Sequence, residues 1–453
     1  MAAPGTSGNS GGGEGGREVW GTRMGFILAA VGSAVGLGNM WRFSYVAAEG
    51  GGAAFVVLYV ALIFIVGVPI LLAEMALGRS TRLSPMGALR AAGGKAWVPM
   101  GALFVLTGLL ILSYYSVIAG WTVRYAIEAL AGGFPGNPGE HFGEIASGRD
   151  ALAYHLGFMA VTIAVVTVGI RGGIEKAALV LMPVLFLILA GLAVWAYTLD
   201  GAAAGYSFYL RPSIEELLNP AILSDAAGQA FFSLSLGMGA MLTFASYLSR
   251  DENLNREATV ISISDFMVAF IAGLVVFPVI FHLGLQDQVS ESTVGALFIS
   301  LPGAFTAMGP AGRVVGTLFF VALAVGALTS AISLLEVVVS SVMDELRVAR
   351  RTAAIAVGTI IAGIGVFPAL SLDLLGILDQ LAGTLFLVVG ALGISIFVGW
   401  RMKGAEDELR QGASGLFLKV VPAVMFMLRW VVPPIIALVL VTTVQDTIQV
   451  LAG

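Results

Sequence analysis

The chain has 453 residues, of which 58% are hydrophobic and only 11% are charged, with a formal net charge of −5. Because soluble domains carry about 25% charged residues, this composition excludes a soluble globular protein and indicates one that crosses a membrane several times. The absence of cysteine excludes disulfides and thiolate metal sites, and the three histidines show no metal-ligand spacing.

Residues 1–16 are rich in Gly, Ser and Ala and lack an apolar core, which predicts a disordered cytoplasmic tail and not a cleavable signal peptide. The segments that follow are apolar and long enough to cross a bilayer. We therefore predict an all-α polytopic membrane protein with eleven transmembrane helices, near residues 23–47, 53–77, 97–130, 152–170, 176–198, 227–248, 258–284, 312–343, 352–367, 373–399 and 416–444.

The basic residues show which side of the membrane each loop faces. Most Lys and Arg residues lie in the N-terminal tail and in the loops after the second, fourth, sixth, eighth and tenth segments. Because cytoplasmic loops carry an excess of Lys and Arg, this distribution predicts a multi-pass protein of the cell membrane with its N-terminus in the cytoplasm.

The first segment contains Gly32, Gly36 and Gly38 together with Asn39 and Arg42. Glycine lowers helix stability by about 1 kcal/mol relative to Ala, and Asn and Arg are costly at membrane depth unless they line a polar cavity. We expect a helix broken near 33–38, whose free carbonyls bind a cation and whose free N–H groups bind a carboxylate. The alternative is a glycine-packed helix interface.

The sixth segment has a similar Ser and Gly cluster in the middle of its span, from Phe231 to Gly239. Interrupted segments at matching positions of two halves indicate an inverted-repeat transporter with its binding site at the membrane midplane. We predict a transporter core at 17–399, with one repeat at 17–198 and the other at 227–399. Residues 400–453 then add a loop and helix 11.

Several motifs resemble those of the neurotransmitter:sodium symporter family, in particular its bacterial amino-acid transporters. They are Trp20–Phe55 with Gly36–Phe43 at its centre, Glu74–Arg79, Tyr114-Tyr115 with Trp121, Phe232–Gly237, Leu328–Ser330 and Asp379–Gly383. The resemblance covers nearly the whole chain after the tail. It implies a five-plus-five inverted repeat and two sodium sites.

The resemblance also implies which oxygens bind sodium. The second site would use the carbonyls of Gly32, Val35 and Gly326 and the hydroxyls of Thr329 and Ser330. Taken alone, these two hydroxyls are typical of side chains that bond back to their own helix. The first site would use the Ala34 carbonyl, Asn39, Ser233, a helix 7 side chain and the carboxylate of the substrate. A ligand shared in this way couples the two binding events.

Helix 7 departs from the family, which usually has Asn at its sodium-ligand position. Alignment on Gly273–Phe277 places Asp265 there, and a one-residue slip would place Ser264 there instead. A further alternative is that Asp265 faces cytosolic water at a helix start, but its neighbours are apolar. Because a fixed carboxylate would replace the anion of chloride-dependent relatives, we expect chloride independence.

The substrate class follows from Gly36, since monoamine carriers of the family have Asp at this position. Glycine leaves space for a substrate carboxylate, which the N–H groups of Leu37 and Gly38 and the hydroxyl of Tyr115 would bind. The ammonium would bind the carbonyls of Ala34, Phe232 and Ser235. An uncharged side-chain pocket is implied at Ile111, Phe232, Met238, Ala331 and Leu334, although each of these residues alone is typical of core packing.

The resemblance further implies two gates and a hinge. Arg42 and Asp379 match the outer charged pair, with Tyr115 and Phe232 as a lid. Arg17 and Asp344 would pair on the inner side near Tyr247 and Trp20, although both could equally be solvated. Gly173 and Pro183 would let helix 5 open locally.

We expect a sodium-coupled symporter that imports hydrophobic or aromatic L-amino acids by alternating access. The sequence shows no nucleophile–base pair, phosphate loop or metal cluster, so we do not expect an enzyme. Its expected partners are the amino acid, Na⁺ and the lipid bilayer, with no nucleic acid. The alternatives are a proton-coupled transporter in which Asp265 carries the proton, and a transporter-like sensor or channel.

Overall fold

The computed structural model describes residues 17–134, 136–284 and 296–452, and the regular elements in these ranges are all helices. Nine of the described helical stretches are long and apolar enough to span a membrane without a break. They are Ala53–Thr81, Lys95–Ala131, Arg149–Thr167, Ile170–Ala196, Leu254–His282, Pro310–Leu346, Arg350–Leu370, Leu372–Arg401 and Leu416–Leu451. The predicted tail at 1–16 lies outside the described residues.

Two further spans are broken, as predicted. The first consists of α1 (Arg23–Ala34), a π-helical turn at Gly38–Arg42 and α2 (Phe43–Glu49), and its two parts meet at 68°. The other consists of α12 (Pro220–Ser233) and α13 (Ala240–Ala245). With these two, the described spans are compatible with the predicted eleven, and the predicted break in the first helix is confirmed.

The backbone at each break explains why the helix stops. Val35, directly after α1, is extended with φ −74° and ψ 114°. After α12, Ser235, Gly237 and Gly239 all adopt positive φ, at 52°, 81° and 72°. Glycine enters this left-handed region without a steric penalty, whereas Ser235 does so at a cost.

The packing of the spans has the symmetry that an inverted repeat requires. The third span, α6 (Val98–Ala131), packs along the eighth, α17 (Pro310–Leu346). The fourth, α8 (Arg149–Thr167), likewise packs along the ninth, α18 (Arg350–Leu370).

The fifth and tenth spans, which occupy matching positions in the two halves, make matching contacts. The fifth span, α9 (Glu175–Ala196), packs on the seventh, α14 (Leu254–His282), and on α17. The tenth span contains α20 (Leu387–Ile396), which packs on the second span at α4 (Val68–Thr81) and on α6. The fifth span thus packs on the seventh and eighth spans, and the tenth span packs on the second and third. These two sets correspond when each span is exchanged with the one five places away, which is the five-plus-five arrangement.

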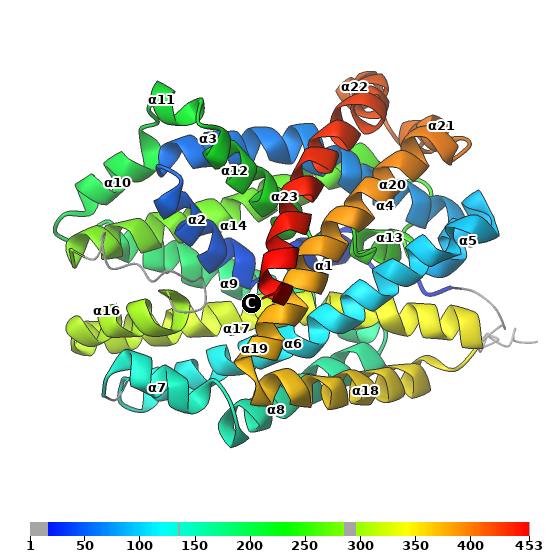
Figure 1. Cartoon of the computed structure of the whole chain (residues 1–453). Helices are drawn as coiled ribbons and strands as arrows, with labels where there is room; N and C mark the ends of the chain where they lie inside the picture. The colour runs from blue at the N-terminus through cyan, green and yellow to red at the C-terminus, as the bar shows by residue number, and fades with distance from the viewer. Residues whose placement is uncertain (1–16, 135, 285–295, 453) are drawn as a thin grey trace, which may run out of the picture.

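Short helices mark the two ends of the bundle (Figure 1). At the left of that view lie α7 (Pro138–Ile145), α10 (Ala202–Leu210) and α16 (Leu301–Ala307). At the right lie α5 (Pro85–Gly93) and the start of the described chain. We call these the outer and the inner end, after the predicted topology.

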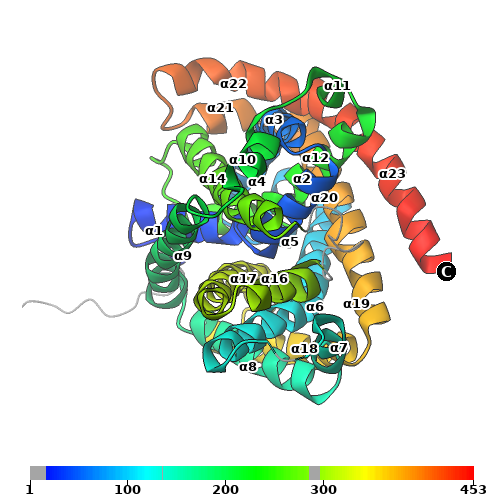
Figure 2. The same ribbon diagram turned by 90° about the vertical axis from the view of Figure 1, so that its left-hand side faces the viewer.

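The last span is peripheral. It consists of α22 (Leu416–Phe426), a π-helical turn and α23 (Val432–Ala452), and it runs along the outside of the bundle in Figure 2. This position fits a helix added to a ten-helix core.

Candidate functional site

A cavity of about 170 Å³ lies where the two broken spans meet α6 and α17. Most of the residues predicted for the substrate line it, namely Ala34, Leu37, Gly38, Ile111, Tyr115, Phe232, Ser235, Met238 and Leu334. Ala331 differs from the prediction, because it is fully buried in α17 and is not part of the cavity wall.

Sequence reasoning missed other lining residues, for two different reasons. Ile118 lies seven positions after Ile111 on α6, so helical periodicity alone could have identified it. Thr384 and Leu387 lie in or directly after a π-helical stretch at Asp379–Phe386. A π-helix shifts the register of the side chains, so the usual 3.6-residue period does not predict which of them face the cavity.

A buried polar cluster lies beside the cavity at the predicted first sodium site. The Asp265 carboxylate accepts hydrogen bonds from Asn39 Nδ2 at 2.6 Å and from Ser233 Oγ at 2.7 Å. The Tyr59 hydroxyl in turn donates to Ser233 Oγ at 2.8 Å. Asp265 is completely buried, whereas Ser264 is half-buried and lies outside the cluster's hydrogen bonds.

The chemistry of this cluster suits a monovalent cation. Within the described residues Asp265 has hydrogen-bonding partners but no Lys, Arg or His in an ion pair. A buried carboxylate without a counter-charge is costly, and a bound Na⁺ would neutralise it. The Asn39 amide directs its nitrogen towards Asp265 while its oxygen accepts from the Gly36 N–H at 3.0 Å, so the amide would have to turn and give up that bond for its oxygen to face a cation there.

The oxygens predicted for the second sodium site also lie together. Ser330 Oγ is 3.3 Å from the Gly32 carbonyl oxygen, 3.0 Å from that of Val35 and 3.2 Å from that of Gly326. The Thr329 hydroxyl donates to the Gly326 carbonyl at 2.9 Å. This set of neutral oxygens suits Na⁺, because carbonyls freed at a broken helix can coordinate the ion.

Glycine at position 32 makes this approach possible. A Cβ atom there would lie 2.8 Å from Thr329 Cβ and 3.0 Å from Met182 Sδ. Any side chain at this position would therefore push α1 away from both α17 and α9. Met182 precedes the predicted hinge residue Pro183, so the hinge region of α9 covers this part of the site.

At the other predicted hinge residue, Gly173, the chain forms a π-helical turn at Ile170–Ile174 that continues directly into α9. Gly173 is buried, and a Cβ atom there would overlap the Val165 carbonyl. The chain is thus continuously helical and tightly packed at Gly173, and its local unwinding stays a prediction.

The predicted carboxylate end of the cavity lies at Gly36 and Leu37. The Leu37 N–H donates to the Tyr115 hydroxyl oxygen at 3.4 Å, a long hydrogen bond. A Cβ atom on Gly36 would lie 2.8 Å from Ser330 Oγ and 2.9 Å from the Tyr115 hydroxyl. A side chain at this position would therefore have to displace one or both of these hydroxyls.

The predicted outer pair lines the cavity but forms no ion pair in the described chain. The Arg42 guanidinium lies over the Phe232 ring, 4.6 Å from its centroid. Asp379 instead accepts a hydrogen bond from the Tyr114 hydroxyl at 2.8 Å. Instead of bonding to each other, Arg42 contacts the face of the Phe232 ring and Asp379 bonds to the Tyr114 hydroxyl.

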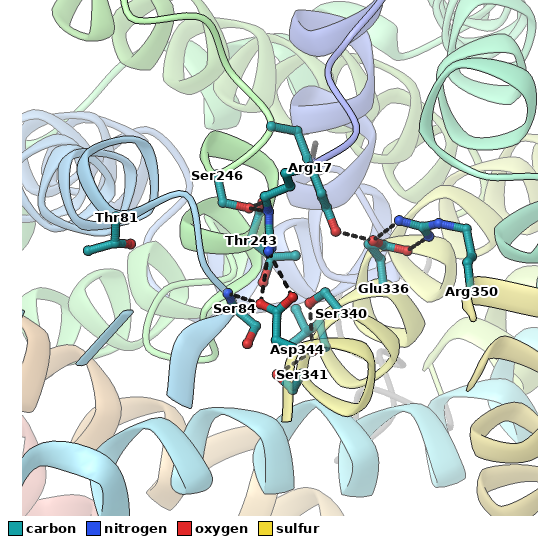
Figure 3. A network of polar contacts seen from close by, with 12 residues as sticks. Arg17, Thr81, Ser84, Thr243, Ser246, Glu336, Ser340, Ser341, Asp344 and Arg350 are labelled. Atoms are coloured by element: carbon teal, nitrogen blue, oxygen red, sulfur yellow. Dashed lines mark hydrogen bonds and ion pairs between the residues drawn. The ribbon is translucent and has the colours of Figure 1, made fainter. Parts of the chain in front are cut away.

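The predicted inner pair, in contrast, is joined and belongs to a polar network (Figure 3). Arg17 Nη1 lies 2.8 Å from an Asp344 oxygen, and Arg17 Nε donates to Ser246 Oγ at 3.0 Å. The same guanidinium lies over the Tyr247 ring at 4.7 Å. Trp20 packs beneath it, where its Nε1–H donates to the Phe244 carbonyl at 3.0 Å.

A second group of charges adjoins this network and was missed by the sequence interpretation. Arg350 pairs with buried Glu336 at 2.6 Å and with Glu18 at 2.7 Å. The Tyr247 hydroxyl also donates to Glu336. Glu336 and Arg350 are only 14 positions apart, whereas Glu18 and Tyr247 come from distant parts of the sequence and reach this pair only through the fold.

Comparisons with known proteins show what this chain is similar to. A model of the sodium:neurotransmitter symporter family matches residues 17–144 and 147–451. An uncharacterised sodium-dependent transporter of Methanocaldococcus jannaschii is 34% identical over 421 residues, covering 88% of this chain and 85% of that protein. The uncharacterised sodium-dependent transporter YhdH of Bacillus subtilis is 34% identical over 414 residues, covering 87% of this chain and 91% of YhdH. The crystal structure of MhsT in complex with L-phenylalanine matches with a TM-score of 0.84 and 38% identity, covering 94% of this chain and 100% of that chain.

Proposed function

This chain belongs to the sodium:neurotransmitter symporter family, and we propose that within it the protein imports hydrophobic L-amino acids, including aromatic ones, together with Na⁺. It is a sodium-dependent membrane transporter and not an enzyme, as the family and the relatives indicate. The finer statements below on substrate, ion sites and chloride are our proposals.

The observation that carries the substrate class is the division of the cavity into a polar end and an apolar wall. Near Gly36 the Leu37 N–H and the Tyr115 hydroxyl are the donors that a carboxylate needs. The rest of the lining includes Ile111, Met238 and Leu334, which bear no charge. A simple amine would leave the donors at the polar end desolvated and unpaired. That a 38% identical structure holds L-phenylalanine supports an aromatic substrate.

We propose two sodium sites with different functions. At the first, Na⁺ would bind Asp265, Asn39, Ser233, the Ala34 carbonyl and the substrate carboxylate, so that substrate and ion each favour binding of the other. At the second, Na⁺ would bind the oxygens of Gly32, Val35, Gly326, Thr329 and Ser330. This ion would fasten the end of α1 to α17, which is the arrangement that the closed inner end requires.

The charge balance supports chloride independence. Two Na⁺ ions, a zwitterionic amino acid and the Asp265 carboxylate together leave one positive charge in the loaded site. Chloride-dependent relatives need an added anion to reach a similar balance, whereas here the carboxylate is built into the chain. We expect equal uptake when external chloride is replaced by gluconate, and a loss of uptake would show that Asp265 is misassigned.

Proton coupling is the second candidate, favoured by a buried carboxylate that has no cationic partner in the described chain. The two candidates are separated by uptake of labelled L-phenylalanine into proteoliposomes. We expect concentrative, saturable uptake with an inward Na⁺ gradient, competed by Leu, Tyr and Trp but not by Lys or Glu. Uptake driven by a pH gradient without Na⁺ would favour the alternative, and non-saturable flux would favour a channel.

A further inference from the structure

Three buried or partly buried serines connect the end of α1 to two other spans. The Ser33 hydroxyl donates to the Ser333 hydroxyl on α17 at 2.8 Å, and Ser333 in turn donates to the Ser330 carbonyl at 2.8 Å. The Ser235 hydroxyl, at the break between α12 and α13, donates to the Ser33 carbonyl at 3.1 Å. Ser33 and Ser333 are only 1% and 0% exposed.

The bond between Ser33 and Ser333 joins α1 to α17, as do the contacts of Ser330 with the Gly32 and Val35 carbonyls. Serine in a helix commonly donates back to a carbonyl of its own helix, as Ser340 does to Val337 at 3.1 Å. The Ser33 hydroxyl instead crosses to a different helix. Ser33 lies in the same turn of α1 as Gly32, whose carbonyl is predicted to bind the second Na⁺.

A second argument comes from the number of protons available at Ser330. Its hydroxyl lies 3.0 to 3.3 Å from the carbonyls of Gly32, Val35 and Gly326. A serine hydroxyl has one proton to donate, so it can bond fully to only one of the three at a time. Ser330 therefore cannot fix both carbonyls of α1 against α17, and another contact must do so.

We propose that Ser33 and Ser333 are positioning residues for the second sodium site, which rests on the function proposed above. Their hydrogen bond holds the carbonyls of α1 at the distance from Ser330 and Thr329 at which one ion contacts all of them. Neither hydroxyl belongs to the predicted ligand set. Their removal therefore acts on sodium through the spacing of the two helices.

The test is equilibrium binding of radioactive Na⁺ to the purified full-length protein and to three variants, Ser33→Ala, Ser333→Ala and the double variant. Loss of one net hydrogen bond predicts a three- to tenfold weaker affinity for Na⁺ in each single variant. Both substitutions remove the Ser33–Ser333 bond, and Ser333→Ala also removes the bond to the Ser330 carbonyl, so the double variant is expected to be no weaker than Ser333→Ala. Ser333→Thr keeps the hydroxyl and should retain most of the affinity.

Ser340→Ala is the matched control, since it removes a buried hydroxyl of α17 that bonds only within its helix. It should leave Na⁺ affinity within twofold of the unmodified protein. Unchanged Na⁺ affinity in Ser33→Ala and Ser333→Ala would overturn the inference, as would independent, additive losses or an equal loss in Ser340→Ala. Absence of Na⁺ binding by the unmodified protein would instead overturn the proposed function.

Discussion

At the scale of single residues, the proposed first ion site takes its negative charge from Asp265. We predict that Asp265→Asn lowers the apparent affinity for Na⁺ at least tenfold, because a neutral amide no longer balances the buried ion. The measurement is the Na⁺ dependence of L-phenylalanine binding. Ser264→Ala is the control, and a larger effect of Ser264→Ala than of Asp265→Asn would reverse the assignment on helix 7.

What the sequence can predict about such residues depends on how unusual they are. Asp265 was identifiable because a carboxylate among apolar neighbours is rare inside a membrane span. Ser33 and Ser333 were not, because serines are common in membrane helices and these two are 300 positions apart. Their pairing depends on the crossing of α1 and α17, which no local pattern encodes.

At the scale of elements, the broken part of the sixth span depends on a carboxylate from the second span. Glu74 is completely buried and accepts hydrogen bonds from the N–H groups of Gly237 at 2.8 Å and Leu242 at 3.3 Å. The Gly237 N–H lies in the non-helical chain between α12 and α13, and the Leu242 N–H lies in the first turn of α13, where N–H groups have no partner within the helix. Glu74 thus accepts hydrogen bonds from N–H groups that have no carbonyl partner within a helix.

We predict that Glu74→Gln destabilises the protein by about 1–3 kcal/mol and weakens substrate binding, since an amide offers one acceptor oxygen in place of two. Thermal unfolding and L-phenylalanine binding measure the two effects. Glu49→Gln, at an exposed position of α2, is the control and should change neither. Normal substrate affinity in Glu74→Gln would show that the break does not need this support.

The positions of the two breaks were predictable from clusters of Gly and Ser, and the structure confirms both. The local geometry was less accessible. In the sixth span, the two glycines adopt positive φ as their lack of a side chain allows, but so does Ser235, at 52°. A strained serine is set by tertiary contacts, here its bond to the Ser33 carbonyl, and sequence propensity gives no sign of it.

At the scale of the whole molecule, the predicted inner charged pair is joined, while the outer charged pair is not joined in the described chain. Arg17 and Asp344 form an ion pair of which 13% and 22% of the side-chain surfaces are exposed. The segment that follows is fastened as well, because the Glu175 carboxylate accepts from the Gly21 N–H and the Thr22 hydroxyl, each at 2.7 Å. Opening of this end must break these contacts together.

The chain contains no cysteine, so a single introduced thiol can report this opening. Thr243 is completely buried beside the Arg17 network (Figure 3), and its hydroxyl has no hydrogen-bond partner among the described residues, so Thr243→Cys removes little. We predict that a polar maleimide labels Thr243→Cys slowly in Na⁺. Adding Arg17→Ala should accelerate labelling several-fold, because the ion pair and the contact with Tyr247 are lost.

Ser249→Cys, at an exposed position nearby, is the control and should label quickly with or without Arg17→Ala. Equal labelling of Thr243→Cys in both backgrounds would show that Arg17 does not hold the inner end closed.

The sequence predicted the spans and their pairing into two halves, because these follow from hydrophobic length and from repeated interruptions. Which end is closed depends on contacts such as that between Arg17 and Asp344, which are 327 positions apart, and so only the fold reveals it.

The central claim is that the two helix breaks bind a sodium ion and an amino acid together. The most direct test is equilibrium binding of labelled L-phenylalanine to the purified protein over a range of Na⁺ concentrations at constant ionic strength, without chloride. We predict no saturable binding in the absence of Na⁺, a steep rise as Na⁺ is added, and loss of this response in Asn39→Ala and Ser330→Ala, both still folded. Saturable binding that is independent of Na⁺, or a normal sodium response in both variants, would contradict the account.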